Sequence, residues 1–192
     1  MNVRIVGIGG SVEPGSQSES ALRAVLAAAA ATGADVQAFT GRQLDFPPYH
    51  SAAALPASAR AYVEAVRAAD AVVISSPGYH GTVSGLVKNA LDYLEELRTD
   101  RRPYLDGRPV GLIAVARGAQ AAVGTLTTLR QIAHALRGWP TPYGLTVNSL
   151  TSRFDEAGRI EDAQVAAGVG ILAGQLTGNR APSPDLRRPV SG

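Results

Sequence analysis

The sequence contains no cysteine, which excludes disulfide bonds, thiolate metal ligands and a cysteine nucleophile. Redox chemistry in this chain would therefore require a cofactor, and we expect no metal site. Aromatic residues make up only 5% of the chain, whereas apolar residues make up 45% and alanine and glycine are abundant. This balance favours helices packed closely on a sheet over an aromatic-rich β-sandwich.

The sequence also lacks a charge excess and a long apolar run. Its 18 Lys and Arg residues nearly balance 16 Asp and Glu residues, and the basic residues are scattered except at Arg98, Arg101 and Arg102. We therefore expect small-molecule partners and no nucleic acid. No apolar run approaches ~18 residues, and the N-terminus has no secretory pattern, so we expect a cytoplasmic protein with no membrane partner.

Strand-like apolar runs alternate with helical patterns five times along the chain. This alternation predicts an α/β fold, a flavodoxin-like three-layer sandwich with a five-stranded parallel sheet in the order 2-1-3-4-5. Residues 1–178 would form a single domain, and residues 179–192, which carry three prolines and no apolar periodicity, would be a disordered C-terminal tail. The predicted strands are residues 3–8, 35–39, 71–75, 109–116 and 143–147, and the predicted helices are residues 18–33, 56–69, 83–97, 125–136 and 160–176.

Parallel sheets of this order bind ligands beyond the carboxyl ends of the strands, where the strand order reverses. The reversal falls between the first and third strands, so the loops at residues 9–18 and 76–82 would line one crevice. The first loop, Gly-Gly-Ser-Val-Glu-Pro-Gly-Ser-Gln-Ser, offers glycines, hydroxyls and a helix N-terminus, a combination suited to a phosphate. Helix capping alone explains such a loop about equally well. The loop lacks the third glycine of a dinucleotide fingerprint and the lysine of a Walker motif, which favours a monophosphate.

The second loop places Tyr79 and His80 between turn residues at the mouth of the same crevice, where a flat ligand could stack. Taken singly, Tyr79 could cover the edge of the core and His80 could be an ordinary surface histidine. Residues 116–124 form a third segment of small residues at the same end of the sheet, and Gly118 would let backbone approach a ring edge. A helix-entry loop without ligand contacts is an equal alternative for this third segment.

Two stretches carry a resemblance to a known family. Gly10-Ser11 with Pro14-Gly15-Ser16 and Ser18, and residues 76–82 followed by Leu-Val-Lys-Asn-Ala-Leu-Asp at residues 86–92, resemble the NADPH-dependent FMN reductase family of flavin, quinone, azo-dye and chromate reductases. The second stretch is the more distinctive. Three positions depart from the family pattern: Glu13 stands where Arg is common, Gly78 where Glu is frequent, and Arg117 where small residues are usual.

The resemblance implies an FMN-dependent enzyme that takes hydride from NADPH or NADH and passes it to a flavin, quinone or similar planar acceptor. It implies a homodimer or tetramer formed through the helix at residues 83–97. It also implies a division of the site: the phosphate would be held by Ser11, Ser16, Gln17 and Ser18, and the flavin ring would be flanked by Pro77, Gly78, Tyr79, His80, Gly81, Thr82, Gly118 and Gly124.

Because the cofactor carries the chemistry, no Ser-His-Asp or paired-carboxylate constellation is needed, and none is visible in the sequence. Tyr79 and His80 are candidates for stacking and orientation only. Two alternatives are a flavodoxin-like electron carrier, whose expected acidic surface is absent, and an FMN-binding module without catalysis. A hydrolase using Ser11 or Ser76 is the weakest alternative, because neither serine lies in a Gly-x-Ser-x-Gly elbow.

Overall fold

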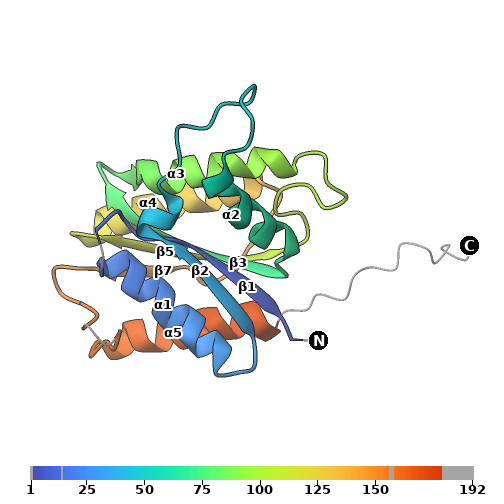
Figure 1. Ribbon diagram of the computed structural model, residues 1–192. Helices are drawn as coiled ribbons and strands as arrows, with labels where there is room; N and C mark the ends of the chain where they lie inside the picture. The colour runs from blue at the N-terminus through green and yellow to red at the C-terminus, as the bar shows by residue number, and fades with distance from the viewer. Residues whose placement is uncertain (1, 14, 156–157, 179–192) are drawn as a thin grey trace, which may run out of the picture.

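The computed structural model describes residues 2–13, 15–155 and 158–178 (Figure 1). The strands are β1 (Arg4–Gly9), β2 (Asp35–Thr40), β3 (Ala71–Tyr79), β4 (Thr82–Val83), β5 (Pro109–Ala116), β6 (Trp139–Pro140) and β7 (Leu145–Asn148). The α-helices are α1 (Gln17–Ala30), α2 (Ala57–Ala68), α3 (Gly85–Asp92), α4 (Ala119–Ala135) and α5 (Ala163–Gly178), and two 3-10 helices are η1 (Gly41–Leu44) and η2 (Tyr93–Leu97).

The described residues form one sheet in the order β2-β1-β3-β5-β6, with β7 also paired to β5. All these pairs are parallel, so the predicted fold class and the reversal between β1 and β3 are confirmed. The predicted count of five strands is wrong, because the sheet has seven. The outermost position is divided between β6, paired to the start of β5, and β7, paired to its end, because Pro142 between them lacks an N–H for the ladder.

The seventh strand arises because β3 runs four residues further than the pattern predicts. Residues 77–79, expected as loop, continue the strand: Pro77 pairs with Val115 of β5, and the two residues after it pair antiparallel with β4. The pairing of β1 with β3 ends at Ser75, so Pro77 lies beyond its reach and its missing N–H costs no bond on that side. The second predicted loop is therefore a tight β3–β4 hairpin whose turn is His80 and Gly81.

Helices cover both faces of the sheet (Figure 1). In the view of Figure 1, α1 and α5 lie below the sheet and α2, α3 and α4 lie above it. Each face has its own apolar core: the first is built from β-strand residues with α1 and α5, and the second with α2, α3, η2 and α4. The central strands are apolar on both sides, as in β5, where every residue after Pro109 is buried. Loops at the strand ends are left to form a site.

Helix boundaries differ from the predictions in three places. The helix α4 begins at Ala119 and not at residue 125, because the alanine-rich segment predicted as a loop is a good helix former. The helix predicted over residues 83–97 is α3 followed by a 3-10 segment, a common tightening of a last turn. The helix α5 begins at Ala163, where the Asp162 carboxylate accepts from the amides of Gln164 and Val165.

The predicted tail at residues 179–192 lies outside the described residues. Within the ranges described, no helix is both long and apolar enough to cross a membrane. The same ranges contain no group of three or more His, Cys, Asp or Glu side chains placed to hold a metal ion.

Candidate functional site

The site is at the carboxyl edge of the sheet, where β1 and β3 end side by side. Gly9 is in register with Ser75, and the Gly10 amide donates to the Ser75 carbonyl at 3.3 Å. A Cβ on Gly9 would stand 2.1 Å from that carbonyl oxygen, so only glycine permits this approach. The strand β2 lies beside β1 and β5 lies beside β3, so the strand order proceeds to opposite sides of this pair, and such a reversal is where parallel sheets bind ligands.

The first loop ends in a serine cap on α1. The Ser16 hydroxyl accepts from the Glu19 amide at 3.3 Å and lies 3.2 Å from the Ser18 hydroxyl, and the Ser16 carbonyl accepts from the Ser20 amide. Within the described part of the chain, the amides of Gln17 and Ser18 have no protein acceptor. The two free N–H groups and the hydroxyls of Ser16 and Ser18 therefore lie at the N-terminus of α1, the positive end of the helix dipole. This donor set suits an anion.

The other two predicted residues of this loop have further bonds. The Ser11 side chain is buried, and its hydroxyl accepts from the Glu13 amide at 3.1 Å, which closes a small turn. The Gln17 side chain spans a long sequence distance: its Nε2 donates to the Phe154 carbonyl at 3.0 Å and its Oε1 accepts from the Phe154 amide at 2.7 Å. Only the backbone N–H of Gln17 is left for a ligand.

The β3–β4 hairpin is the second part of the site. Its turn uses the left-handed region at His80 (φ 51°) and Gly81 (φ 85°), which sharply reverses the chain. The hairpin base is fixed by Ser76, whose buried hydroxyl accepts from the Ser84 amide at 2.9 Å, and Ser84 in turn caps α3. The Tyr79 side chain is 51% exposed, so its ring is free to meet a flat ligand.

The hairpin packs against the first turns of α4. A Cβ on Gly78 would stand 2.6 Å from the Thr125 hydroxyl and 3.0 Å from Ala116 Cβ, which explains why this position has no side chain. The Thr125 hydroxyl donates to the Thr82 carbonyl at 3.4 Å, and Gly124 lies against the Gly81 carbonyl. Gly124, predicted in a loop, is thus a helical residue that lets α4 approach the hairpin.

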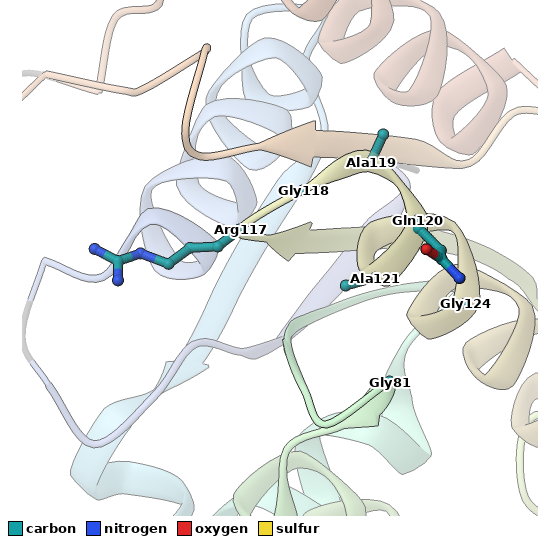
Figure 2. Close-up of a pocket in the computed structure, with 7 residues that line it drawn as sticks. All are labelled: Gly81, Arg117, Gly118, Ala119, Gln120, Ala121 and Gly124. Atoms are coloured by element: carbon teal, nitrogen blue, oxygen red, sulfur yellow. The ribbon is translucent and has the colours of Figure 1, made fainter.

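The third part is a cavity of about 530 Å³ between the hairpin and α4. The turn before α4 consists of Arg117 and Gly118, and Gly118 (φ 114°) is a cap without a side chain. Among the described residues, the amides of Ala119, Gln120 and Ala121 consequently have no protein acceptor. Figure 2 shows Arg117 extending away from the other lining residues, which are Gly81, Gly118, Ala119, Gln120, Ala121 and Gly124.

Two of the glycines that line this cavity border open space. A Cβ at Gly81 or Gly118 would meet nothing within 4 Å, so backbone faces the cavity directly on both sides. Six large apolar side chains of the described residues are prominently exposed, and four of them belong to segments at this edge: Val12, Tyr79, Val123 and Leu150. Exposed apolar residues that gather around backbone donors are typical of a site for a flat, partly apolar ligand.

Asn148 was not predicted to belong to the site. Its Oδ1 accepts from the Gly118 amide at 2.9 Å and from the Leu150 amide at 3.1 Å, so it joins the turn before α4 to the loop after β7. The signal for it was present in the sequence, because Asn148 directly follows a predicted strand at the carboxyl edge. The residues after it, 149–155, form a fourth loop of the site, which reaches the first turn of α1 through the pairing of Gln17 with Phe154.

The chain is similar to a known family of proteins. Residues 3–150 match the NADPH-dependent FMN reductase family. An FMN-dependent NADPH-azoreductase of Staphylococcus haemolyticus is 32% identical over 130 residues, which are 66% of this chain and 65% of that enzyme. An NAD(P)H-dependent FMN reductase of Pseudomonas aeruginosa is 26% identical over 166 residues, 84% of this chain and 86% of that protein. The match therefore spans slightly less than two thirds of the staphylococcal enzyme.

Solved structures show the same fold. The flavoenzyme NAD(P)H:(acceptor) oxidoreductase FerB from Paracoccus denitrificans superposes with a TM-score of 0.73 at 19% identity, covering 91% of this chain and 95% of that one. The apo form of the NADH:FMN oxidoreductase EmoB superposes with a TM-score of 0.69 at 21% identity, covering 97% of this chain and 100% of that one. A flavodoxin, WrbA-like protein from Agrobacterium tumefaciens gives a TM-score of 0.61 at 15% identity, covering 93% of this chain and 96% of that one.

Proposed function

Since the chain belongs to the NADPH-dependent FMN reductase family, we propose that it is an FMN-dependent oxidoreductase that oxidises NAD(P)H and reduces a planar small molecule. The observation that carries this proposal is the pairing of two helix N-termini with free amides, those of α1 and α4, on either side of the β3–β4 hairpin. One end suits a phosphate and the other suits the carbonyl edge of a flat ring, with apolar groups between them. FMN has a phosphate at one end and a flat ring with a carbonyl edge at the other.

The residues present fit the cofactor. The amides of Gln17 and Ser18 with the hydroxyls of Ser11, Ser16 and Ser18 would hold the phosphate. The hairpin, Pro77, Gly78, Tyr79, His80, Gly81 and Thr82, would lie along the ring, and Gly118 and Gly124 would bring the backbone of α4 to its edge. The glycine backbone at Gly81 and Gly118, which faces open space, is the cradle that such a ring would fill.

The protein's own contribution is positioning. Bound FMN supplies the redox chemistry, since a flavin accepts a hydride from NAD(P)H and returns it to an acceptor. The exposed Tyr79 ring would orient the second planar molecule by stacking, and His80 would border it from the turn. The rigid hairpin and the apolar side chains around it would keep water from the reacting faces.

Absorption spectroscopy of the purified protein tests this function. We expect FMN to bind in the micromolar range or tighter, a free energy of about 8 kcal/mol or more, and anaerobic NADPH or NADH to bleach the flavin band. Menadione or free FMN should then restore the band with turnover. Binding without bleaching by either nucleotide would identify an electron carrier or a non-catalytic module, and no binding of FMN at all would refute the proposal.

Asn148 provides a test of the ring end of the site. Asn148→Leu removes the acceptor of two amides, so the Gly118 turn should loosen and the Kd for FMN should rise by about tenfold, the value of one or two hydrogen bonds. Asn148→Asp keeps an acceptor oxygen and should bind FMN more tightly than the leucine variant. Flavin fluorescence titration measures both. Equal affinity of the leucine variant and the wild type would show that Asn148 does not position the site.

The proposal includes several features that the family resemblance implies. Residues 1–178 would act as one FMN-binding domain in the cytoplasm. The chain would form a homodimer or tetramer through α3 and η2. The electron acceptor would be a flavin, quinone or azo compound, the last being the kind of substrate for which the staphylococcal azoreductase is named.

A further inference from the structure

The phosphate end of the site has too little positive charge of its own. Residues 9–18 include no lysine or arginine, and they carry a carboxylate at Glu13. A helix N-terminus contributes the equivalent of about half a positive charge, whereas the phosphate of FMN is close to a dianion at neutral pH. The Arg23 guanidinium on α1 is not free to help, because it is bonded to the Glu19 carboxylate at 2.7 Å. A cation from another segment would therefore strengthen the binding of the phosphate.

The loop at residues 149–155 reaches the phosphate end. The Gln17 side chain, on the first turn of α1, pairs with both the amide and the carbonyl of Phe154. The Phe154 ring is buried in the core between α1 and α5, and Phe154 forms a β-bridge with Ile160. The backbone at this point is consequently fixed beside the amides that would hold the phosphate.

Arg153 is the residue directly before this anchor. Side chains alternate along an extended segment, so the burial of Phe154 turns Arg153 outward, and Arg153 is exposed. It has no acceptor among the described residues. Arg159, next to the partner of Phe154 in the β-bridge, is ion-paired instead, because its Nη2 lies 2.8 Å from the Asp155 carboxylate. The loop thus presents an exposed guanidinium, without an acceptor among the described residues, one position before the residue that Gln17 binds.

We propose that Arg153 is the cationic ligand of the cofactor phosphate and that Gln17 is the positioning residue that holds Arg153 in place. This inference rests on the proposed function, since it assigns a residue to the same FMN site. Glu13, on the loop at residues 9–18, would then point to solvent, and Arg153 would compensate the charge of the phosphate dianion.

The test compares FMN with riboflavin, which has the same ring and no phosphate. In Arg153→Gln we expect the Kd for FMN to rise about tenfold and the Kd for riboflavin to stay unchanged, because only the charged contact is lost. Arg153→Lys should keep much of the FMN affinity. Arg159→Gln is the matched control, since it makes the same change at a nearby ion-paired arginine, and it should alter neither Kd. Added salt should weaken FMN binding more steeply in the wild type than in Arg153→Gln.

Each outcome of the titration decides between named alternatives. Unchanged FMN affinity in Arg153→Gln, or an equal loss for both flavins, would overturn the assignment of Arg153 and leave the proposed function standing. Failure of the wild-type chain to bind either flavin would instead overturn the proposed function and this inference with it. For Gln17→Leu, which frees the anchor, we expect an FMN-selective loss as in Arg153→Gln, and a loss equal for both flavins would count against the positioning role.

Discussion

Replacing Arg108 with alanine is expected to lower the free energy of unfolding by about 3–5 kcal/mol. Arg108 is 1% exposed, and its guanidinium donates to three backbone carbonyls: Nε to Ala69 at 2.9 Å, Nη1 to Tyr104 at 2.7 Å and Nη2 to Arg67 at 2.8 Å. Alanine would leave these carbonyls without their donor and would open a cavity below the end of α2. Each unsatisfied buried carbonyl costs about 1–3 kcal/mol, partly relieved where water enters.

The charge on Arg108 adds to the effect of its hydrogen bonds. Burial, together with the positive charge of Arg102, lowers the pKa of Arg108 to about 10, although Asp100 and Asp106 oppose the shift. The side chain is therefore still protonated at neutral pH. It neutralises the negative end of the α2 dipole, because two of its three acceptors are the last carbonyls of that helix and its cap. Arg108 thus fixes both the end of α2 and the loop that leads into β5.

Urea denaturation followed by circular dichroism measures the expected loss. Arg102→Ala is the matched control, since Arg102 makes one exposed bond to the Asp106 carbonyl, and it should change stability by no more than about 0.5 kcal/mol. Arg108 stands at the amino end of β5, opposite the site, so folded Arg108→Ala should bind FMN with unchanged affinity. A loss below about 1 kcal/mol would mean that water satisfies the three carbonyls after the substitution.

The strands and the edge of the site could be predicted because their causes are local. The apolar, β-branched runs of β1, β3 and β5 are buried on both faces of the sheet. Such continuous runs are typical of the central strands of a parallel sheet that helices cover on both sides. The glycine at the end of β1 also has a local cause, since the close approach of two strands leaves no room for a Cβ. The position of the reversal then places the serine loop and the hairpin in one crevice.

The features that escaped prediction depend on contacts between distant segments. The extension of β3 to Tyr79 requires β5 as a partner, because an isolated Pro-Gly-Tyr sequence indicates a turn. The pairing of Gln17 with Phe154 joins residues 137 positions apart, and no periodicity in either segment indicates it. The fourth loop was missed for this reason, although Asn148 at a strand end was a usable signal. The early start of α4 was a local error, in which small residues were interpreted as loop and not as helix formers.

Gly9→Ala is expected to have the largest effect on the site itself, lowering the free energy of unfolding by about 2–4 kcal/mol and raising the Kd for FMN by at least about tenfold. The added Cβ would stand 2.1 Å from the Ser75 carbonyl oxygen and 2.9 Å from its carbon. Both atoms are backbone in the central strand β3, so they can yield only if β1 and β3 separate. The φ of +156° at Gly9 adds strain for any other residue.

The loss of affinity follows from the bonds that Ser75 makes to the phosphate loop. Its hydroxyl donates to the Ser18 carbonyl at 2.8 Å, and its carbonyl accepts from the Gly10 amide, so a displaced Ser75 would move both ends of that loop. Gly33→Ala is the control, because Gly33 (φ +94°) has nothing near its Cβ position and lies far from the site. It should cost only about 1–2 kcal/mol of backbone strain and leave FMN binding intact. If Gly9→Ala lost stability like Gly33→Ala but kept wild-type affinity for FMN, the spacing of β1 and β3 could not be what sets the phosphate end of the site.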